Sequence, residues 1–224
     1  MAVTAIVLAA GEGTRMKSAH PKVAHSILGK PMVWWAVRTV RQAGADRVVV
    51  VVGHGADEVK AIFDGQADVE FVEQTQRLGT GHACRTALEG AGISDGTVVI
   101  TCGDTPLLRA DTIAQLVQRV QDSGDAGAVL TMTPPDVTGY GRVQLDATGQ
   151  VQAIIEHKDC TDEQRQTLLE CNSGVYAFDG ALLAKHIYQI GNQNSQGEYY
   201  LTDMVQIMRE HDLSFSSVHA DDYA

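Results

Sequence analysis

Five short apolar runs, rich in β-branched residues, alternate with stretches of helical spacing in the first 132 residues. The runs are Ala5–Leu8, Val48–Val52, Val69–Val72, Val98–Thr101 and Ala128–Met132. Nearly continuous apolar runs are typical of strands buried on both faces, as in parallel sheets. The stretches between them predict helices over Pro31–Gln42, Ala56–Phe63, Thr80–Leu88 and Asp111–Gln121, with Pro31 at a first helical position and Asp111 as an N-cap. The alternation predicts an α/β fold with a doubly wound, mostly parallel, Rossmann-like sheet and right-handed crossovers.

The pattern changes after residue 133. Pro134, Pro135 and the segment Gly139–Arg142 predict a loop, and an Asp-Ala-Thr-Gly turn after it predicts a hairpin. The elements expected here are strands at Val143–Leu145, Val151–Ile155, Gly174–Phe178 and Ser214–His219, and helices at Thr161–Leu168, Ala181–Gln189 and Tyr200–Glu210. We expect one domain over residues 1–224, with a nucleotide-binding half at 1–133 and a smaller α+β, sugar-binding half at 134–224.

The charge distribution restricts the ligands that this chain can bind. The net charge is −11, whereas residues 1–30 carry +3 and the remainder −14. A general nucleic-acid or anionic-membrane binder needs a basic surface, so we expect neither partner, and any polyanion should bind near the N-terminal segment. The four cysteines form no CxxC pair, and no apolar stretch approaches the length of a membrane span. We therefore expect reduced thiols and a cytoplasmic protein.

A glycine-bearing motif, Leu8-Ala-Ala-Gly-Glu-Gly-Thr-Arg15, directly follows the first predicted strand. Open α/β sheets bind ligands at the carboxyl ends of strands, and small residues let backbone N–H groups approach phosphate oxygens. Gly-x-Gly alone would equally suit a tight turn. The third glycine of a dinucleotide fingerprint and the Gly-Lys-Ser/Thr of a Walker A loop are both missing, which argues against NAD and P-loop chemistry. Arg15 and Lys22 are instead expected to form a cationic clamp on phosphates.

An ordered set of motifs extends this first one over residues 4–203. It comprises LAAGEGTRM followed by Pro21-Lys22, then LGKPM (Leu28–Met32), QRLGTGHA (Gln76–Ala83), GDTPLL (Gly103–Leu108), GYGR (Gly139–Arg142), IEHKD (Ile155–Asp159), CNSGVY (Cys171–Tyr176) and QGEYYLTD (Gln196–Asp203). The first motif alone indicates the sugar nucleotidyltransferase superfamily. The whole set resembles the uridylyltransferase (pyrophosphorylase) domain of the bifunctional N-acetylglucosamine-1-phosphate uridylyltransferase/glucosamine-1-phosphate acetyltransferase, and QGEYYLTD is its most selective piece.

The resemblance implies a reaction and the residues for its charged part. UTP and N-acetylglucosamine 1-phosphate would give UDP-N-acetylglucosamine, a peptidoglycan precursor for cell-wall biogenesis, and pyrophosphate, through Mg²⁺-assisted in-line attack on the α-phosphate. Such chemistry requires positioning and charge neutralisation rather than a covalent nucleophile. Arg15 and Lys22 would be catalytic and Asp104 would bind the metal. The alternatives are two solvated cations and a turn-forming Asp before Thr-Pro.

The resemblance also implies which residues hold the two substrates. Nucleotide binding would fall to Leu8, Ala9, Ala10, Gly11, Gly13, Gln74, Gly79 and Thr80, with the Gln74 amide and the 78–81 loop selecting uracil. Sugar binding would fall to Gly141, Glu156, Asn172 and Thr202. Taken singly, these residues have ordinary alternatives: Gln74 as a solvated strand end, Asn172 as a turn residue, Glu156 as surface and Thr202 as a helix cap.

Two departures from the family pattern affect these expectations. Cys102 stands where the family commonly has a Tyr before Gly-Asp. The family's second metal ligand, an Asn, follows the last strand in a segment beyond Ala224, so Asp104 has no identified protein partner and we expect weakened metal binding. The acetyltransferase β-helix is absent from these residues, so we expect neither acetyl-CoA binding nor the family's trimer, and the oligomeric state stays open.

Two other functions remain open. One is a related nucleotidyltransferase with a different nucleotide or sugar phosphate, and the other is a nucleotide-sugar-binding module with weak or no turnover. The eight histidines show neither metal-ligand spacing nor a triad with Ser or Cys, so we expect them at the surface or in satisfied structural roles.

Overall fold

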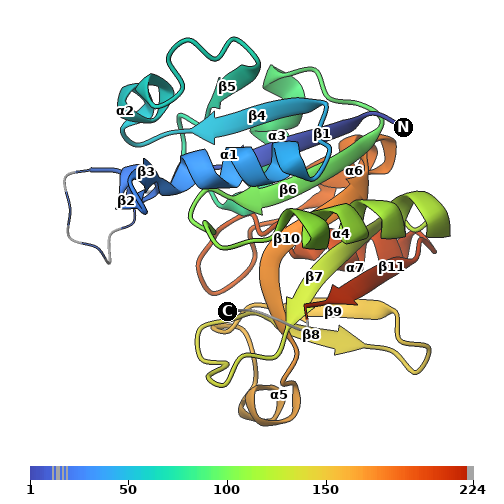
Figure 1. The fold of residues 1–224 in the computed structure, drawn as a ribbon. Helices are drawn as coiled ribbons and strands as arrows, with labels where there is room; N and C mark the ends of the chain where they lie inside the picture. Colours follow the sequence, from blue (N-terminus) through green and yellow to red (C-terminus); the bar gives the residue numbers. More distant parts are fainter. Residues whose placement is uncertain (12, 14–15, 17, 19, 221–224) are drawn as a thin grey trace.

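The computed structural model describes residues 1–11, 13, 16, 18 and 20–220 of the chain. Within these residues, nine strands form one sheet with helices on both faces, and two short strands form a second (Figure 1). The strands of the large sheet are β1 (Val3–Leu8), β4 (Arg47–Val52), β5 (Val69–Glu73), β6 (Thr97–Cys102), β7 (Gly127–Met132), β8 (Arg142–Leu145), β9 (Val151–Ile155), β10 (Cys171–Asp179) and β11 (Phe215–His219). The small sheet pairs β2 (Ser26–Ile27) with β3 (Lys30–Pro31).

The large sheet is mostly parallel, as predicted. Its main path runs β11-β7-β10-β6-β1-β4-β5. Strands β6, β1, β4 and β5 are parallel neighbours, β7 and β11 are parallel, and β10 is inserted antiparallel between β6 and β7. Because β10 and β11 come from residues beyond 133, both halves of the sequence contribute to one continuous sheet.

The helices lie close to their predicted positions. They are α1 (Met32–Gln42), α2 (Ala56–Ala61), α3 (Thr80–Gly90), α4 (Ala110–Ser123), α5 (Asp162–Thr167), α6 (Gly180–His186) and α7 (Asp203–Glu210), with single 3₁₀ turns at η2 (Lys22–Ala24) and η3 (Ile187–Gln189). In the first half of the chain, two predicted helix starts were wrong. Pro31 is the N-cap residue of α1 rather than its first residue, because it belongs to β3. Arg109 rather than Asp111 precedes α4, so Asp111 lies in the first turn, where its charge still complements the helix dipole.

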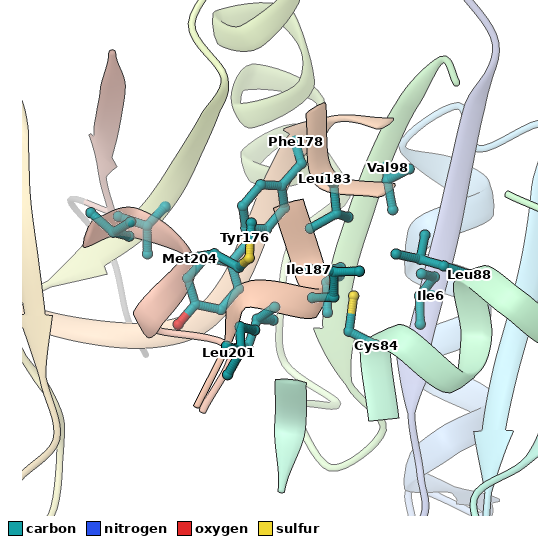
Figure 2. Packing of buried hydrophobic residues seen from close by; sticks show 14 of the residues in the cluster. Ile6, Cys84, Leu88, Val98, Tyr176, Phe178, Leu183, Ile187, Leu201 and Met204 are labelled. Atoms are coloured by element: carbon teal, nitrogen blue, oxygen red, sulfur yellow. The ribbon is translucent and has the colours of Figure 1, made fainter. Parts of the chain in front are cut away.

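Two hydrophobic clusters cover opposite faces of the parallel strands. In β4, Val49 and Val51 belong to the cluster under α3, α6 and α7, whereas Val48, Val50 and Val52 belong to the cluster under α1 and α2. Figure 2 shows the first cluster, where Cys84 and Leu88 of α3 and Ile187 gather around Ile6 of β1. Burying a Val or Ile side chain contributes roughly 1.5–3 kcal/mol, so this double burial fixes the strand ends that carry the motifs.

The hairpin β8–β9 and helix α5 form a separate lobe at the lower end of the molecule in Figure 1. The lobe is tied to the large sheet by pairing of Arg142 with Cys171 at the start of β10, and α7 packs against β9. None of the helices in the described part of the chain combines the length and hydrophobicity that a membrane span requires.

Candidate active site

A cavity of about 580 Å³ opens at the carboxyl ends of β1, β5 and β6. Nine of the residues predicted to bind nucleotide, phosphate or metal line it: Leu8, Ala10, Gly11, Gly13, Lys22, Gln74, Gly79, Thr80 and Asp104. The other lining residues are Val23, Arg77, Ala83, Cys102 and Glu198. The structure therefore brings most of the first-half predictions together in one place.

The first loop lies beside Asp104 because β1 and β6 are neighbours. The Gly103 N–H donates to the Leu8 carbonyl at 2.8 Å, which joins the two strand ends. Ala9 faces away from the cavity: it is 1% exposed within the core, and its N–H donates to the Val51 carbonyl at 2.8 Å. Its expected nucleotide contact stays a prediction.

The glycine loop packs directly against Lys22. Gly13 has a φ of 63°, and a Cβ at this position would lie 2.5 Å from the Cβ of Lys22, so only glycine permits the approach. A Cβ on Gly11 would meet no atom within 4 Å, so the backbone there borders open space. Arg15, the other half of the predicted clamp, lies outside the described residues.

Lys22 forms an ion pair with Asp104 across 82 residues of sequence. Its ammonium donates to Asp104 Oδ2 at 2.5 Å, and the two side chains are 34% and 29% exposed. The pair therefore borders the cavity while remaining accessible to a ligand. Among the described residues, no three His, Cys, Asp or Glu side chains form a group that could hold a metal ion by themselves. Asp104 alone supplies one carboxylate, and Mg²⁺ typically takes further oxygen ligands beside it.

Gln74 follows β5 and is nearly enclosed, with 4% of its surface exposed. Its Nε2 donates to the Gly79 carbonyl at 3.2 Å and to His82 Nδ1 at 2.8 Å. The predicted alternative of a solvated strand-end residue is excluded by this burial. Gln74 instead has a fixed side chain that lines the cavity.

The 78–81 loop is held by the QGEYYLTD motif. The Tyr199 N–H donates to the Leu78 carbonyl at 2.7 Å, and the Gly81 N–H donates to the Tyr199 carbonyl at 2.8 Å. Gly79 has a φ of 109°, and a Cβ on it would lie 2.5 Å from the Tyr199 oxygen. The Thr80 hydroxyl accepts from the Leu201 N–H at 3.0 Å. These contacts explain why the Gly-Thr-Gly sequence is needed at this point.

The four predicted sugar-binding residues form a second group, outside the lining of the cavity. The Thr202 hydroxyl donates to Glu156 Oε1 at 3.4 Å, and the Asn172 N–H donates to the Gly141 carbonyl at 2.9 Å. A Cβ on Gly141 would lie 3.5 Å from Glu156 Oε2, which links the two pairs. Burial raises the pKa of Glu156. The group thus presents a partly desolvated carboxyl beside a backbone junction of β8 and β10.

Cys102 lies between this group and the cavity. It lines the cavity, and a Cβ on Gly174, two residues after Asn172, would lie 3.7 Å from its sulfur. Burial, with a smaller contribution from the Asp104 charge, raises the pKa of Cys102 to about 12. The neutral thiol is therefore a packing surface rather than a nucleophile.

Four cavity residues were not predicted: Val23, Arg77, Ala83 and Glu198. Arg77 and Ala83 belong to QRLGTGHA, and Glu198 belongs to QGEYYLTD. Both motifs therefore indicated segments that line the cavity, although the predicted binding residues were other positions within them. Val23 adjoins Lys22 in a 3₁₀ turn too short for a periodic signal.

A comparison with protein-family models matches residues 5–167 to the MobA-like NTP transferase domain. The chain belongs to this family. The match covers most of β1, the parallel strands β4 to β7, the β8–β9 hairpin and every cavity-lining residue except Glu198 of this MobA-like NTP transferase domain. The α/β nucleotidyltransferase fold and the recognition of the family are thereby confirmed.

Curated relatives add a narrower similarity. The chain is 50% identical over 208 residues to the bifunctional protein GlmU of Streptomyces avermitilis, covering 92% of this chain and 43% of the relative. It is 44% identical over 223 residues to GlmU of Trichlorobacter lovleyi, covering 99% and 48%, and 44% identical over 217 residues to GlmU of Shouchella clausii, covering 97% and 47%. The chain thus spans just under half the length of these relatives.

Proposed function

We propose that this chain transfers UMP from UTP to N-acetylglucosamine 1-phosphate, giving UDP-N-acetylglucosamine and pyrophosphate. The observation that carries the proposal is a single cavity with an open glycine backbone and the Lys22–Asp104 pair at one side and the buried Gln74 amide at another. The similarity to proteins named GlmU supports this choice of substrates.

The triphosphate would bind against the glycine loop and Lys22. Backbone N–H groups near Gly11 and Gly13 approach the phosphate oxygens, and the Lys22 ammonium neutralises charge on the α-phosphate as the sugar phosphate oxygen attacks it. The bond to pyrophosphate breaks on the opposite side, so no protein nucleophile is needed. This is the type of catalysis expected from positioning and electrostatic stabilisation.

Asp104 fits the requirements of Mg²⁺. It offers a hard carboxylate at a strand end inside the cavity, and Mg²⁺ typically binds one or two carboxylates together with substrate phosphates and water. When bound, the ion would neutralise phosphate charge. Lys22 already shares this carboxylate, so the same residue would orient the lysine and hold the metal.

The sugar phosphate would lie beyond Cys102, with its sugar at Gly141, Glu156, Asn172 and Thr202. The Glu156 carboxylate can accept from a sugar hydroxyl, and the neighbouring groups can bond to the acetamide. On this basis, residues 1–133 would hold the nucleotide and residues 134–224 the sugar within one domain. We further propose a cytoplasmic location, which the four free thiols support.

A substrate panel tests the proposal. Pyrophosphate release is measured with ATP, CTP, GTP and UTP against several sugar 1-phosphates in the presence of Mg²⁺. We expect turnover with UTP and N-acetylglucosamine 1-phosphate to exceed every other pair by at least tenfold. Equal rates with all four nucleotides would contradict the proposed specificity. Calorimetric binding of UDP-N-acetylglucosamine with no turnover in either direction would instead show a binding module.

A further inference from the structure

The orientation of the Gln74 amide is fixed by its neighbours. The Gly79 carbonyl can only accept, so the amide atom 3.2 Å away must be the nitrogen, Nε2. The same nitrogen lies 2.8 Å from His82 Nδ1. An amide nitrogen carries two hydrogens, and these two acceptors use both of them.

This arrangement also fixes the proton on His82. Nδ1 accepts the bond from Gln74, so a neutral His82 carries its proton on Nε2. Burial, with Arg85 adding to it, lowers the pKa of His82 and favours the neutral ring. The His82 ring also packs 6.4 Å from the Tyr199 ring, centroid to centroid, within the contact between the 78–81 loop and the 196–203 segment.

We propose that His82 is a positioning residue that makes Gln74 present only its oxygen to the base, and that it thereby selects uracil over cytosine. The inference rests on the proposed function, because it assumes that the base binds beside Gln74. Gln74 lines the cavity, and none of the described residues donates a hydrogen bond to its Oε1.

The two pyrimidines differ in the group that faces such an oxygen. Uracil carries a hydrogen at ring position N3 and can donate it, whereas N3 of cytosine is an acceptor. Two facing acceptors leave the amide oxygen unpaired in a nearly enclosed position, which is costly. Without His82, the shorter of the two contacts that hold Nε2 is lost and only the Gly79 carbonyl at 3.2 Å opposes rotation of the amide, so the amide can turn more readily to serve either base.

Mutation of His82 tests the inference through the preference for UTP over CTP, which is the ratio of the two kcat/KM values. We measure kcat/KM for UTP and for CTP with the parent, His82→Ala, His82→Asn and the surface control His211→Ala. We expect His82→Ala to lower the UTP/CTP ratio about tenfold, because the amide then keeps only its contact with the Gly79 carbonyl. His82→Asn should restore most of the ratio, since its Oδ1 can accept in place of Nδ1.

A pH series adds a readout that a structural role would not produce. Protonated His82 would carry hydrogen on Nδ1 and could no longer accept from Gln74. The charged groups that act on it are Arg85 and Glu89 on α3, and Tyr199 faces it from the other segment. Because the pKa of His82 is lowered from its ordinary value of 6.5, the parent's UTP/CTP ratio should fall as the pH drops below 6.5, whereas that of His82→Asn should stay constant.

The outcomes separate this inference from the proposed function. A parent that turns over no nucleotide, or that shows no preference for UTP over CTP, overturns the function and this inference with it. A parent that prefers UTP, together with a His82→Ala variant of unchanged ratio, overturns only the role of His82. Nitrogen NMR provides an independent check, since a neutral His82 with its proton on Nδ1 would also contradict the geometry.

Discussion

The two ends of the proposed site, the phosphate end and the sugar end, differ in how far their polar groups are exposed to solvent. At the phosphate end, the Lys22–Asp104 pair is about one-third exposed and the loop backbone at Gly11 borders open space. At the sugar end, Thr202 is 4% exposed, and burial raises the pKa of its partner Glu156. In the proposed complex, the highly charged triphosphate would meet groups that are hydrated before it binds, whereas the uncharged sugar ring would meet groups that are already partly desolvated.

This difference in exposure predicts how substitutions at each end should affect catalysis and stability. Removing a charge at the exposed end should affect catalysis and leave the fold nearly intact, because exposed ion pairs contribute only about 0–1 kcal/mol to stability. Changes at the buried end should affect sugar binding and stability together, because partly buried polar groups are costly to leave unpaired.

The largest predicted effect comes from removing a phosphate-binding cation. Lys22→Ala and Arg15→Ala should each lower kcat about 100- to 1000-fold, the usual cost of losing one group that stabilises developing charge. Steady-state pyrophosphate release measures the effect, and circular dichroism should show an unchanged melting transition. Lys60→Ala is the matched control, since Lys60 lies on α2, pairs with Glu73 of β5 and does not line the cavity. Parent-like activity in Lys22→Ala would contradict the clamp.

The second prediction concerns the crowding between Gly13 and Lys22. Gly13→Ala places a Cβ on a backbone of positive φ and in overlap with the Lys22 Cβ, so kcat should fall about 30-fold as the ammonium is displaced. Gly149→Ala, in the β8–β9 turn, is the control, because its φ is 82° but its Cβ would meet nothing within 4 Å. Equal kinetic losses in the two variants would show that backbone strain alone is responsible.

The third prediction separates the sugar end from the phosphate end. Glu156→Gln should raise KM for N-acetylglucosamine 1-phosphate about tenfold, because a charged acceptor is replaced by a neutral amide. KM for UTP should change less than twofold in the same initial-rate assay. The exposed Glu163→Gln on α5 serves as the control. A rise in KM for UTP alone would place Glu156 at the nucleotide and would contradict its proposed contact with the sugar.

The smallest effect is a dependence of stability on pH at the start of α7. Burial, with repulsion from Asp159, raises the pKa of Asp203 to about 6, so the folded state holds this proton more tightly than the unfolded state. The ionised carboxylate therefore destabilises the fold progressively as the pH rises towards and past 6. Asp203→Asn should gain about 1 kcal/mol at pH 8, a value reduced for partial solvation, and little below pH 4.

Urea unfolding of the parent and Asp203→Asn at several pH values measures this difference. The exposed Asp122→Asn on α4 should show none of it. If the difference in free energy of unfolding between Asp203→Asn and the parent is the same at every pH, the carboxyl is not desolvated in the folded protein.

The parallel half could be predicted from sequence because its signals are local. Doubly buried strands give continuous apolar runs, and the motifs follow them directly at the strand ends. The Lys22–Asp104 ion pair had no such signal, because it joins residues 82 positions apart whose contact depends on the β1–β6 pairing.

In the second half of the sequence, two elements begin at other residues than the local sequence pattern predicts. Helix α7 was expected from Tyr200 but begins at Asp203, because Tyr199 and Leu201 bond to the 78–81 loop instead. Strand β10 was expected from Gly174 but begins at Cys171, with a register shift between Asn172 and Tyr176. The glycine at position 174, with φ of 81°, interrupts the alternation on which the prediction depended.

A crystal structure of the protein with UTP and Mg²⁺ would show directly whether the glycine loop and Lys22 bind the triphosphate. We expect a triphosphate within hydrogen-bonding distance of the Gly11–Gly13 backbone and the Lys22 ammonium, a cation on Asp104, and uracil against Gln74. A nucleotide bound elsewhere, with Lys22 still directed only at Asp104, would contradict it.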